Sequence, residues 1–223
     1  MTNGNCKLPC WWGIVPGETE WQTAKSFLRT LATKISTGPY SESDPEFIAY
    51  LDIPVMEDLS AANVLRQYFS VQDGVIVKIQ PEPSHRMPFT VISEILDDYG
   101  LPSEIWLDTY GYSHGELNPF RLVLFYPEKG ILARYFDDAE FEDDDVVGCF
   151  SNHTGAVVLW APDLELTFAE ALNGTRALGT YGEQYYKPLE EATDMDIETF
   201  YQTYLDPDTE TCIETPAELW MDR

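Results

Sequence analysis

The spacing of apolar residues alternates along the chain between a helical period and a strand-like one, and these patterns predict where helices and strands lie. Thr19 and Gln22 have the spacing of a capping box before a first helix, and Gly100 with Pro102 ends a second helix that begins near Thr90. One face of the first helix is formed by Trp21, Ala24, Phe27, Leu28, Leu31, Ala32 and Ile35. We expect further helices over 167–173, 194–205 and 215–218, and strands over 47–53, 68–71, 75–79, 104–109, 120–126, 131–136, 146–149 and 156–160.

Two glycine-containing turns indicate β-hairpins. The first is Asp73-Gly74 and the second is Pro127-Glu128-Lys129-Gly130. Because hairpins join antiparallel neighbours, the order predicts an α+β fold, with two helix-plus-β-hairpin units, an antiparallel sheet packed on helices and an acidic C-terminal extension. We place these parts at 1–83, 84–150 and 151–223, packed on one core as one compact domain.

The charge of the chain is strongly negative and uneven. Lys and Arg number 13 against 39 Asp and Glu, which gives a net charge of −26. Residues 1–136 hold 10 basic and 17 acidic residues, a balance of −7, and residues 137–223 hold 3 and 22, a balance of −19. This argues against nucleic acids and anionic membrane surfaces as partners, because both require basic patches. The acidic part is either a solvated surface that keeps copies apart or an attractant for a basic partner.

The cysteines favour two disulfides. Cys6 and Cys10 would close a small loop, and Cys149 and Cys212 would clamp the C-terminal part. Disulfides indicate an oxidising compartment, and four reduced thiols in the cytosol are the alternative.

The chain shows few residues with recognisable chemistry. No phosphate-binding loop, dinucleotide fingerprint or hydrolase elbow is present, and we expect no cofactor and no membrane span. The acids at Asp143, Asp144 and Asp145 are a weak calcium candidate that lacks the EF-hand spacing. His114, beside Glu116, is either an acid–base group or part of a solvated loop.

Aromatic residues supply the candidate binding surface. Adjacent residues on an extended segment face opposite ways, so one of Trp11 and Trp12 can be exposed for binding, or both can fill the base of the fold. Further candidate binding residues are the loop aromatics Tyr110, Tyr112, Tyr181, Tyr185 and Tyr186.

Both ends of the chain resemble those of a known group of proteins. The opening Cys6-Lys-Leu-Pro-Cys-Trp-Trp-Gly-Ile-Val-Pro-Gly-Glu-Thr19 and the ending Cys212-Ile-Glu-Thr-Pro-Ala-Glu-Leu-Trp220 resemble a group of uncharacterised secreted proteins or lipoproteins of bacteria, notably of the Chloroflexi type. That resemblance covers about a tenth of the chain. It implies an extracellular or cell-surface location after an exported leader, with a lipid anchor as an open alternative.

A second resemblance is to small outer-membrane assembly lipoproteins and the β-lactamase-inhibitor-protein-like fold. It is carried by Ile14-Val-Pro-Gly-Glu-Thr19 before an amphipathic helix. Proteins of that kind pair helices with a short antiparallel sheet, sometimes in tandem, and bind other proteins. Fold analogy is only an association with function.

Three functions follow from these observations. The first is an exported, disulfide-stabilised, non-catalytic binding or interaction protein for a protein or small extracellular ligand. The alternative is a carboxylate-dependent hydrolase of extracellular carbohydrate, which requires two acids roughly 5–10 Å apart in one cleft. A second alternative is an acidic mimic that inhibits a nucleic-acid-binding protein.

Overall fold

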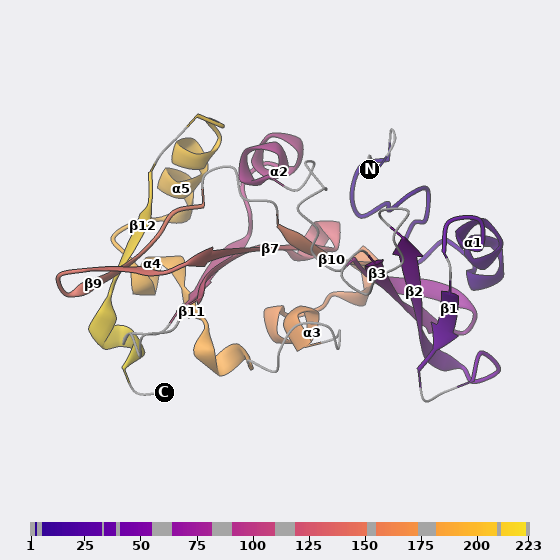
Figure 1. Cartoon of the computed structure of the whole chain (residues 1–223). Coiled ribbons are helices and arrows are strands. Elements are labelled where there is room, and N and C mark those ends of the chain that lie inside the picture. Colours follow the sequence, from indigo (N-terminus) through magenta and orange to yellow (C-terminus); the bar gives the residue numbers. More distant parts are fainter. Residues whose placement is uncertain are drawn as a thin grey trace. The chain divides into compact units, whose positions relative to one another are not determined.

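Helices and antiparallel strands make up the chain, with more residues in strands, which confirms the mixed α+β class (Figure 1). The computed structural model describes residues 3, 6–32, 34–38, 41–54, 64–81, 91–109, 119–150, 155–173, 182–208 and 211–221. The chain divides into two units, each made of segments distant in the sequence. Unit 1 comprises 1–84, 127–131 and 157–178, and unit 2 comprises 85–126, 132–156 and 179–223.

Unit 1 is built on an antiparallel sheet with the strand order β1-β2-β3-β4-β10. The hairpin expected at Asp73-Gly74 joins β3 to β4, and both turn residues have positive φ, at 49° and 82°. The elements of unit 1 are α1 (Trp21–Leu28), β1 (Lys34–Thr37), β2 (Glu46–Pro54), β3 (Val64–Gln72), β4 (Val75–Pro81), η3 (Pro127–Lys129), β10 (Ala156–Trp160, in unit 1 from residue 157), η4 (Pro162–Leu164) and α3 (Phe168–Asn173).

Alternate side chains of β2 form the core beneath α1. Trp21 meets Phe47 edge-on, with ring centroids 5.9 Å apart, and lies 6.3 Å from Phe69. Such aromatic pairs add to the free energy gained by burying apolar area. The buried residues of β2 are Phe47, Ala49, Leu51 and Ile53.

The first helix is shorter than the apolar spacing predicts. It ends at Leu28, Phe27 is 44% exposed, and Ile35 belongs to β1, where it pairs with Leu51. The expected capping box is also wrong, because the Thr19 hydroxyl accepts a hydrogen bond from the Val15 backbone N–H instead. Pairing with β2 thus overrides the helical period after Leu28.

Unit 2 holds two antiparallel sheets, with the orders β7-β6-β5-β11 and β12-β9-β8. Strand β6 is central and buried along nearly its whole length, and the helices α2 and α5 lie against each other (Figure 1). The elements are α2 (Ile92–Tyr99), β5 (Glu104–Asp108), β6 (Pro119–Tyr126), β7 (Ile131–Asp138, in unit 2 from residue 132), β8 (Glu140–Glu142), β9 (Asp145–Gly148), η5 (Glu183–Tyr185), β11 (Lys187–Pro188), α4 (Leu189–Ala192), α5 (Ile197–Tyr204), β12 (Ile213–Pro216) and η6 (Ala217–Trp220).

The end expected for the second helix is confirmed, whereas the short helix expected near the end of the chain is not formed. Gly100 ends α2 with a φ of 75°, as its position predicts. The final element is a 3-10 turn, η6, because Thr215 belongs to β12 and its hydroxyl accepts a hydrogen bond from Trp220 Nε1 at 3.0 Å instead of capping a helix.

We expect Gly130→Ala to destabilise unit 1 far more than Gly74→Ala. Both glycines have positive φ, so each substitution costs about 1 kcal/mol of backbone strain. At Gly130 the new Cβ would also overlap the carbonyl oxygen of Trp160, whereas nothing lies within 4 Å at Gly74. The overlap adds about 1–3 kcal/mol. Urea unfolding midpoints of the two variants measure the difference, and equal midpoints would contradict the close approach.

Candidate functional site

Residues 6–14 of unit 1, called the tryptophan loop below, form the clearest candidate site. Trp11 N–H donates to the Ile14 carbonyl at 2.8 Å, and Ile14 N–H donates back at 2.9 Å. Trp12 and Gly13 therefore form a two-residue turn, and their φ values of 53° and 80° are those of type I′. Gly13 suits this turn, but tryptophan is an unusual residue for a left-handed position.

A covalent bond and a buried amide hold the tryptophan loop in shape. Cys6 and Cys10 form a disulfide. The Asn3 side chain donates to the carbonyls of Cys6 and Cys10 at 2.6 and 2.9 Å, and its oxygen accepts from Trp12 N–H at 2.7 Å. The turn is thus fixed from inside by one side chain that satisfies three backbone groups.

The segment after the tryptophan loop is attached to β4. Gly17 N–H donates to the carbonyl of Ile76 at 2.7 Å, and Ile76 N–H donates to the carbonyl of Thr19 at 2.9 Å. A Cβ at Gly17 would approach the Ala161 side chain to 2.9 Å. The loop therefore extends from a segment that is fixed on the sheet.

The two tryptophans differ in environment, but they do not face opposite ways on an extended segment, because Trp12 lies in the left-handed turn and its ring lies beside that of Trp11. Trp11 is fully buried, whereas Trp12 is partly exposed, and their ring centroids lie 5.3 Å apart. Lys7 is the single titratable side chain between residues 6 and 14, because both cysteines are oxidised. The chemistry of the loop therefore suits contact with a partner better than proton transfer.

The second disulfide anchors an acidic hairpin in unit 2. Cys149 and Cys212 are bonded next to the register pair Gly148 and Ile213, so the disulfide joins the ends of β9 and β12. Both disulfides thus have the expected pairing. Asp137 accepts from Cys149 N–H at 2.7 Å, which fixes the base of the β8–β9 hairpin.

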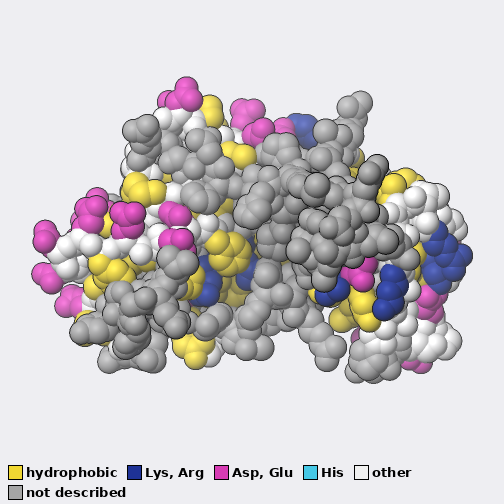
Figure 2. Space-filling model, in the orientation of Figure 1, with side chains coloured by type: hydrophobic (Ala, Val, Ile, Leu, Met, Phe, Trp, Pro, Cys, Tyr) yellow, Lys and Arg dark blue, Asp and Glu magenta, His cyan; other side chains and the backbone are white. Residues whose placement is uncertain are grey.

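The carboxylates of this hairpin are exposed. Glu140, Glu142, Asp143 and Asp144 are exposed, and Figure 2 shows Asp and Glu side chains gathered at the β8–β9 end of unit 2. Asp145, in β9, pairs with Glu142. In the described part of the chain, no three His, Cys, Asp or Glu side chains are placed to hold a metal ion, the calcium candidates included.

Of the remaining aromatic and histidine candidates, the structure describes Tyr185 and Tyr186. Tyr110, Tyr112 and His114 lie outside the described residues, as do Tyr181 and Glu116. Tyr185 is partly exposed in η5. Tyr186 lies in the interior instead of on the loop surface expected from the sequence, because its position next to β11 places it beside the β5 strand.

Unit 2 contains a buried polar cluster that sequence reasoning missed. Asp108 and Arg121 are cross-strand partners joined by an ion pair, and Arg134 hydrogen-bonds the Tyr186 hydroxyl. Burial raises the pKa of Tyr186 and lowers the pKa of Arg134. The available signal was a single arginine in each of the apolar runs 120–126 and 131–136.

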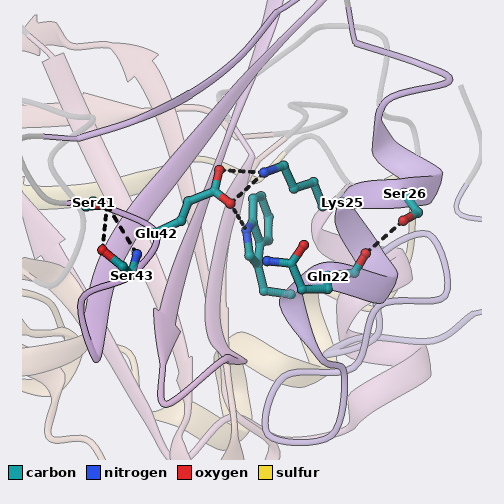
Figure 3. A network of polar contacts seen from close by, with 7 residues as sticks. Gln22, Lys25, Ser26, Ser41, Glu42 and Ser43 are labelled. Atoms are coloured by element: carbon teal, nitrogen blue, oxygen red, sulfur yellow. Dashed lines mark hydrogen bonds and ion pairs between the residues drawn. The ribbon is translucent and has the colours of Figure 1, made fainter.

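A second polar network in unit 1 has a structural role (Figure 3). Lys25 of α1 donates to both carboxylate oxygens of Glu42 at 2.6 and 2.5 Å, and Trp21 Nε1 donates to Glu42 at 3.4 Å. The hydrogen bond from Lys25 is the main cause that lowers the pKa of Glu42. The pair is balanced in charge, so it fixes the 41–44 turn on α1 and leaves no charge for a ligand.

Lys78 is a further buried charge that the sequence did not single out. It lies in β4, is 8% exposed, and donates at 3.4 Å to the carbonyl of Glu170 in α3. Burial lowers its pKa to about 8. The imine-forming chemistry of a lysine amine needs a substrate site around the amine, and the described contacts of Lys78 are those of an α3 anchor.

Comparison with protein-family models, with curated proteins and with solved structures gives no match. Among the described residues, no helix combines the length and the apolar character needed to cross a membrane.

We expect Asn3→Ala to loosen the tryptophan loop without unfolding unit 1. The substitution leaves two carbonyls and the Trp12 N–H without their partner, at a cost of about 2–3 kcal/mol to the local structure. Hydrogen exchange at the Trp12 amide should become faster, while the amides of β3 and β4 keep their protection. Unchanged exchange at Trp12 would show that Asn3 does not hold the turn.

We expect stability to rise with pH as Lys78 loses its proton. The folded pKa of about 8 lies below the ordinary 10.5, so the unfolded chain binds more protons between these values and alkali favours the folded state. From pH 7 to about 9.5 the gain is about 2 kcal/mol. Lys78→Met should be more stable than the parent at pH 7 and should lack this rise in urea unfolding. A parallel rise in both proteins would contradict the assignment to Lys78.

Proposed function

We propose that the protein is an exported, disulfide-stabilised, non-catalytic binding protein that contacts its partner through the tryptophan loop. The observation that carries this proposal is the left-handed, partly exposed Trp12 at the tip of a braced turn. A bulky residue in this conformation costs about 1–2 kcal/mol that Gly, Asn or Asp would avoid. Backbone outliers of this kind persist where a side chain has a role at a site.

The build of the tryptophan loop suits recognition. Tryptophan offers a large apolar surface with one N–H donor and is enriched among the residues that dominate binding free energy. The disulfide and Asn3 order the turn before any partner arrives, so less conformational entropy is lost on binding. Trp11 supports Trp12 from the interior.

Location and partner class follow from disulfides and charge. Two disulfides favour an oxidising compartment, which supports an extracellular or cell-surface place of action. Unit 2 carries 5 basic and 25 acidic residues, a balance of −20, so neutral or basic surfaces are favoured as partners over nucleic acid. We propose a protein or an uncharged extracellular saccharide as the ligand class.

As part of this proposal, the fold consists of two helix-plus-hairpin units. Helix α1 precedes the β3–β4 hairpin, and α2 precedes the β6–β7 hairpin, as two helix-plus-hairpin units require. The interaction role of such folds supports, by analogy alone, a binding function.

We expect Trp12→Asn to leave the stability of unit 1 within about 1 kcal/mol of the parent. The loss of the Trp11–Trp12 contact costs about 0.5–1.5 kcal/mol, and asparagine tolerates the left-handed turn, which recovers a similar amount. Trp11→Ala, at a fully buried position, should cost about 3–5 kcal/mol. Thermal and urea unfolding compare the three proteins, and a large loss in Trp12→Asn would assign Trp12 a structural role.

Binding assays with the same Trp12→Asn variant test the function itself. The parent would be sedimented with peptidoglycan, cellulose and chitin and passed over an array of extracellular peptides. Phe27→Gln is the matched control, because Phe27 is an exposed aromatic of unit 1 outside the tryptophan loop. The proposal requires binding to fall at least about tenfold in Trp12→Asn and to persist in Phe27→Gln. Binding that survives in Trp12→Asn would overturn it.

A further inference from the structure

The C-terminal end of α1 and the strand that follows it carry a basic and apolar surface, called the β1 patch below. Its members are Phe27, Arg29, Leu31, Lys34 and Ile35. Phe27 and Leu31 are 44% and 39% exposed, and Arg29 and Lys34 are also exposed. Among the described residues, neither Arg29 nor Lys34 forms an ion pair. Figure 2 shows Lys and Arg side chains on this part of unit 1. An acidic protein thus keeps two cations without a bound carboxylate beside exposed apolar side chains.

Strand β1 of this patch is an edge strand. It comes first in the strand order of its sheet, so no described strand pairs with its outer side. Ile35 lies opposite Leu51, which belongs to the core beneath α1, and it is only partly buried. Lys34 and Ser36 face the other side of the sheet, because side chains alternate along a strand. The open edge therefore offers backbone groups, an apolar residue on one face and a cation on the other.

The acidic hairpin of unit 2 has the complementary pattern. Strand β8 is the edge of the sheet β12-β9-β8, and its three residues are exposed. Phe141, in the middle, is 37% exposed. Glu140 and Glu142 flank it and face the opposite side of the strand. An apolar residue between two carboxylates thus matches an apolar residue next to a cation on β1.

We propose that β8 of one molecule pairs with β1 of a second copy of the chain. With Phe141 opposite Ile35, the Phe141 ring lies on the α1 side, where Leu31 is exposed, and one of the two flanking glutamates lies opposite Lys34. Cross-strand pairs of opposite charge, and pairs of an aromatic with a β-branched residue, stabilise neighbouring strands. The backbone hydrogen bonds of the added strand supply further affinity.

Charge favours contact between these two unlike surfaces over contact between like ones. Unit 2 carries 5 basic and 25 acidic residues, a balance of −20. Unit 1 holds the remaining 13 − 5 = 8 basic and 39 − 25 = 14 acidic residues, a balance of −6. Two β8 strands side by side would place glutamates opposite each other, which destabilises a strand pair. The acidic hairpin therefore finds its best match within this protein on the β1 patch.

Sedimentation velocity of the full chain tests the association. We choose about 0.15 M sodium chloride, because a Debye length of about 8 Å limits the general repulsion between acidic molecules. The weight-average sedimentation coefficient should rise with protein concentration, with a Kd of about 10–100 µM for so small a contact. A coefficient that does not rise up to about 1 mM would overturn the proposal.

A hairpin variant separates specific pairing from general repulsion. Glu140→Gln with Glu142→Gln changes the net charge from −26 to −24, so general repulsion alone would let this protein associate more strongly. The proposed pairing requires the opposite, an association at least about tenfold weaker than that of the parent. Glu190→Gln with Glu191→Gln is the matched control, because it makes the same charge change at exposed residues of α4. Equal effects of the two double substitutions would overturn the pairing.

A patch variant and a mixing experiment identify the partner surface. Arg29→Gln with Lys34→Gln removes the cations of the β1 patch and should also weaken association at least about tenfold. An equimolar mixture of the patch variant and the hairpin variant should form a 1:1 complex, because one keeps the acidic hairpin and the other keeps the β1 patch. A mixture that stays monomeric, or a patch variant that associates like the parent, would overturn the assignment. These outcomes do not depend on the tryptophan loop.

Discussion

The antiparallel pairing of β10 with β4 is the contact on which unit 1 depends. It joins Trp160 to Lys78 and Leu159 to Ile79, residues about 80 positions apart in the chain. Ile76, in the same strand β4, forms backbone hydrogen bonds with Gly17 and Thr19 of the segment that follows the tryptophan loop. Trp160 N–H, in β10, donates to the Gly130 carbonyl at 2.9 Å. Because the loop-closure entropy of a non-local strand pair is lost only once, every later contact on β4 gains from it. Lys78, which contacts α3, and Trp160, which lies close to Gly130, are themselves partners in this pairing.

Charge is treated differently at the surface and in the interior. Unit 2 exposes the carboxylates of its hairpin, where water screens them, and holds two arginines inside. Exposed acids contribute little to stability, whereas each buried guanidinium needs a partner of opposite charge. In unit 1 the positive charge of Lys25 is balanced by the negative charge of Glu42, and this pair has the structural role of joining α1 to the 41–44 turn. In unit 2 the Asp108–Arg121 pair is more deeply buried than the Lys25–Glu42 pair, and it joins β5 to β6.

The tryptophan loop shows how local strain and rigidity go together. A type I′ turn is normally made by Asn-Gly or Asp-Gly, as at Asp73-Gly74 in this same chain. The protein thus contains both the relaxed form of the turn and, at Trp12-Gly13, a strained one. Two hydrogen bonds donated by the Asn3 side chain, one that it accepts from the Trp12 N–H, and one disulfide keep the strained form in place. The candidate site therefore differs from the β3–β4 hairpin turn in having a bulky tryptophan at a left-handed position that Asp or Asn usually occupies.

The sequence by itself determined the class of the fold, most strand positions and the glycine turns, because these follow from local periodicity and turn chemistry. It favoured the two disulfide pairs that the structure contains, with four reduced thiols as the alternative. It left open whether Trp11 and Trp12 are both buried or one of them is exposed, and the turn at Trp12-Gly13 decides this. It did not determine where the first helix ends, since the pairing of Ile35 with Leu51 decides that. Nor did it show that Asp108 pairs with Arg121, because the register of β5 on β6 decides that, or that Tyr186 lies inside, because Tyr186 comes from a later segment that packs beside β5. Local propensities act over a few residues, whereas the burial of a charge beside its partners is decided only when the tertiary structure brings the strands together.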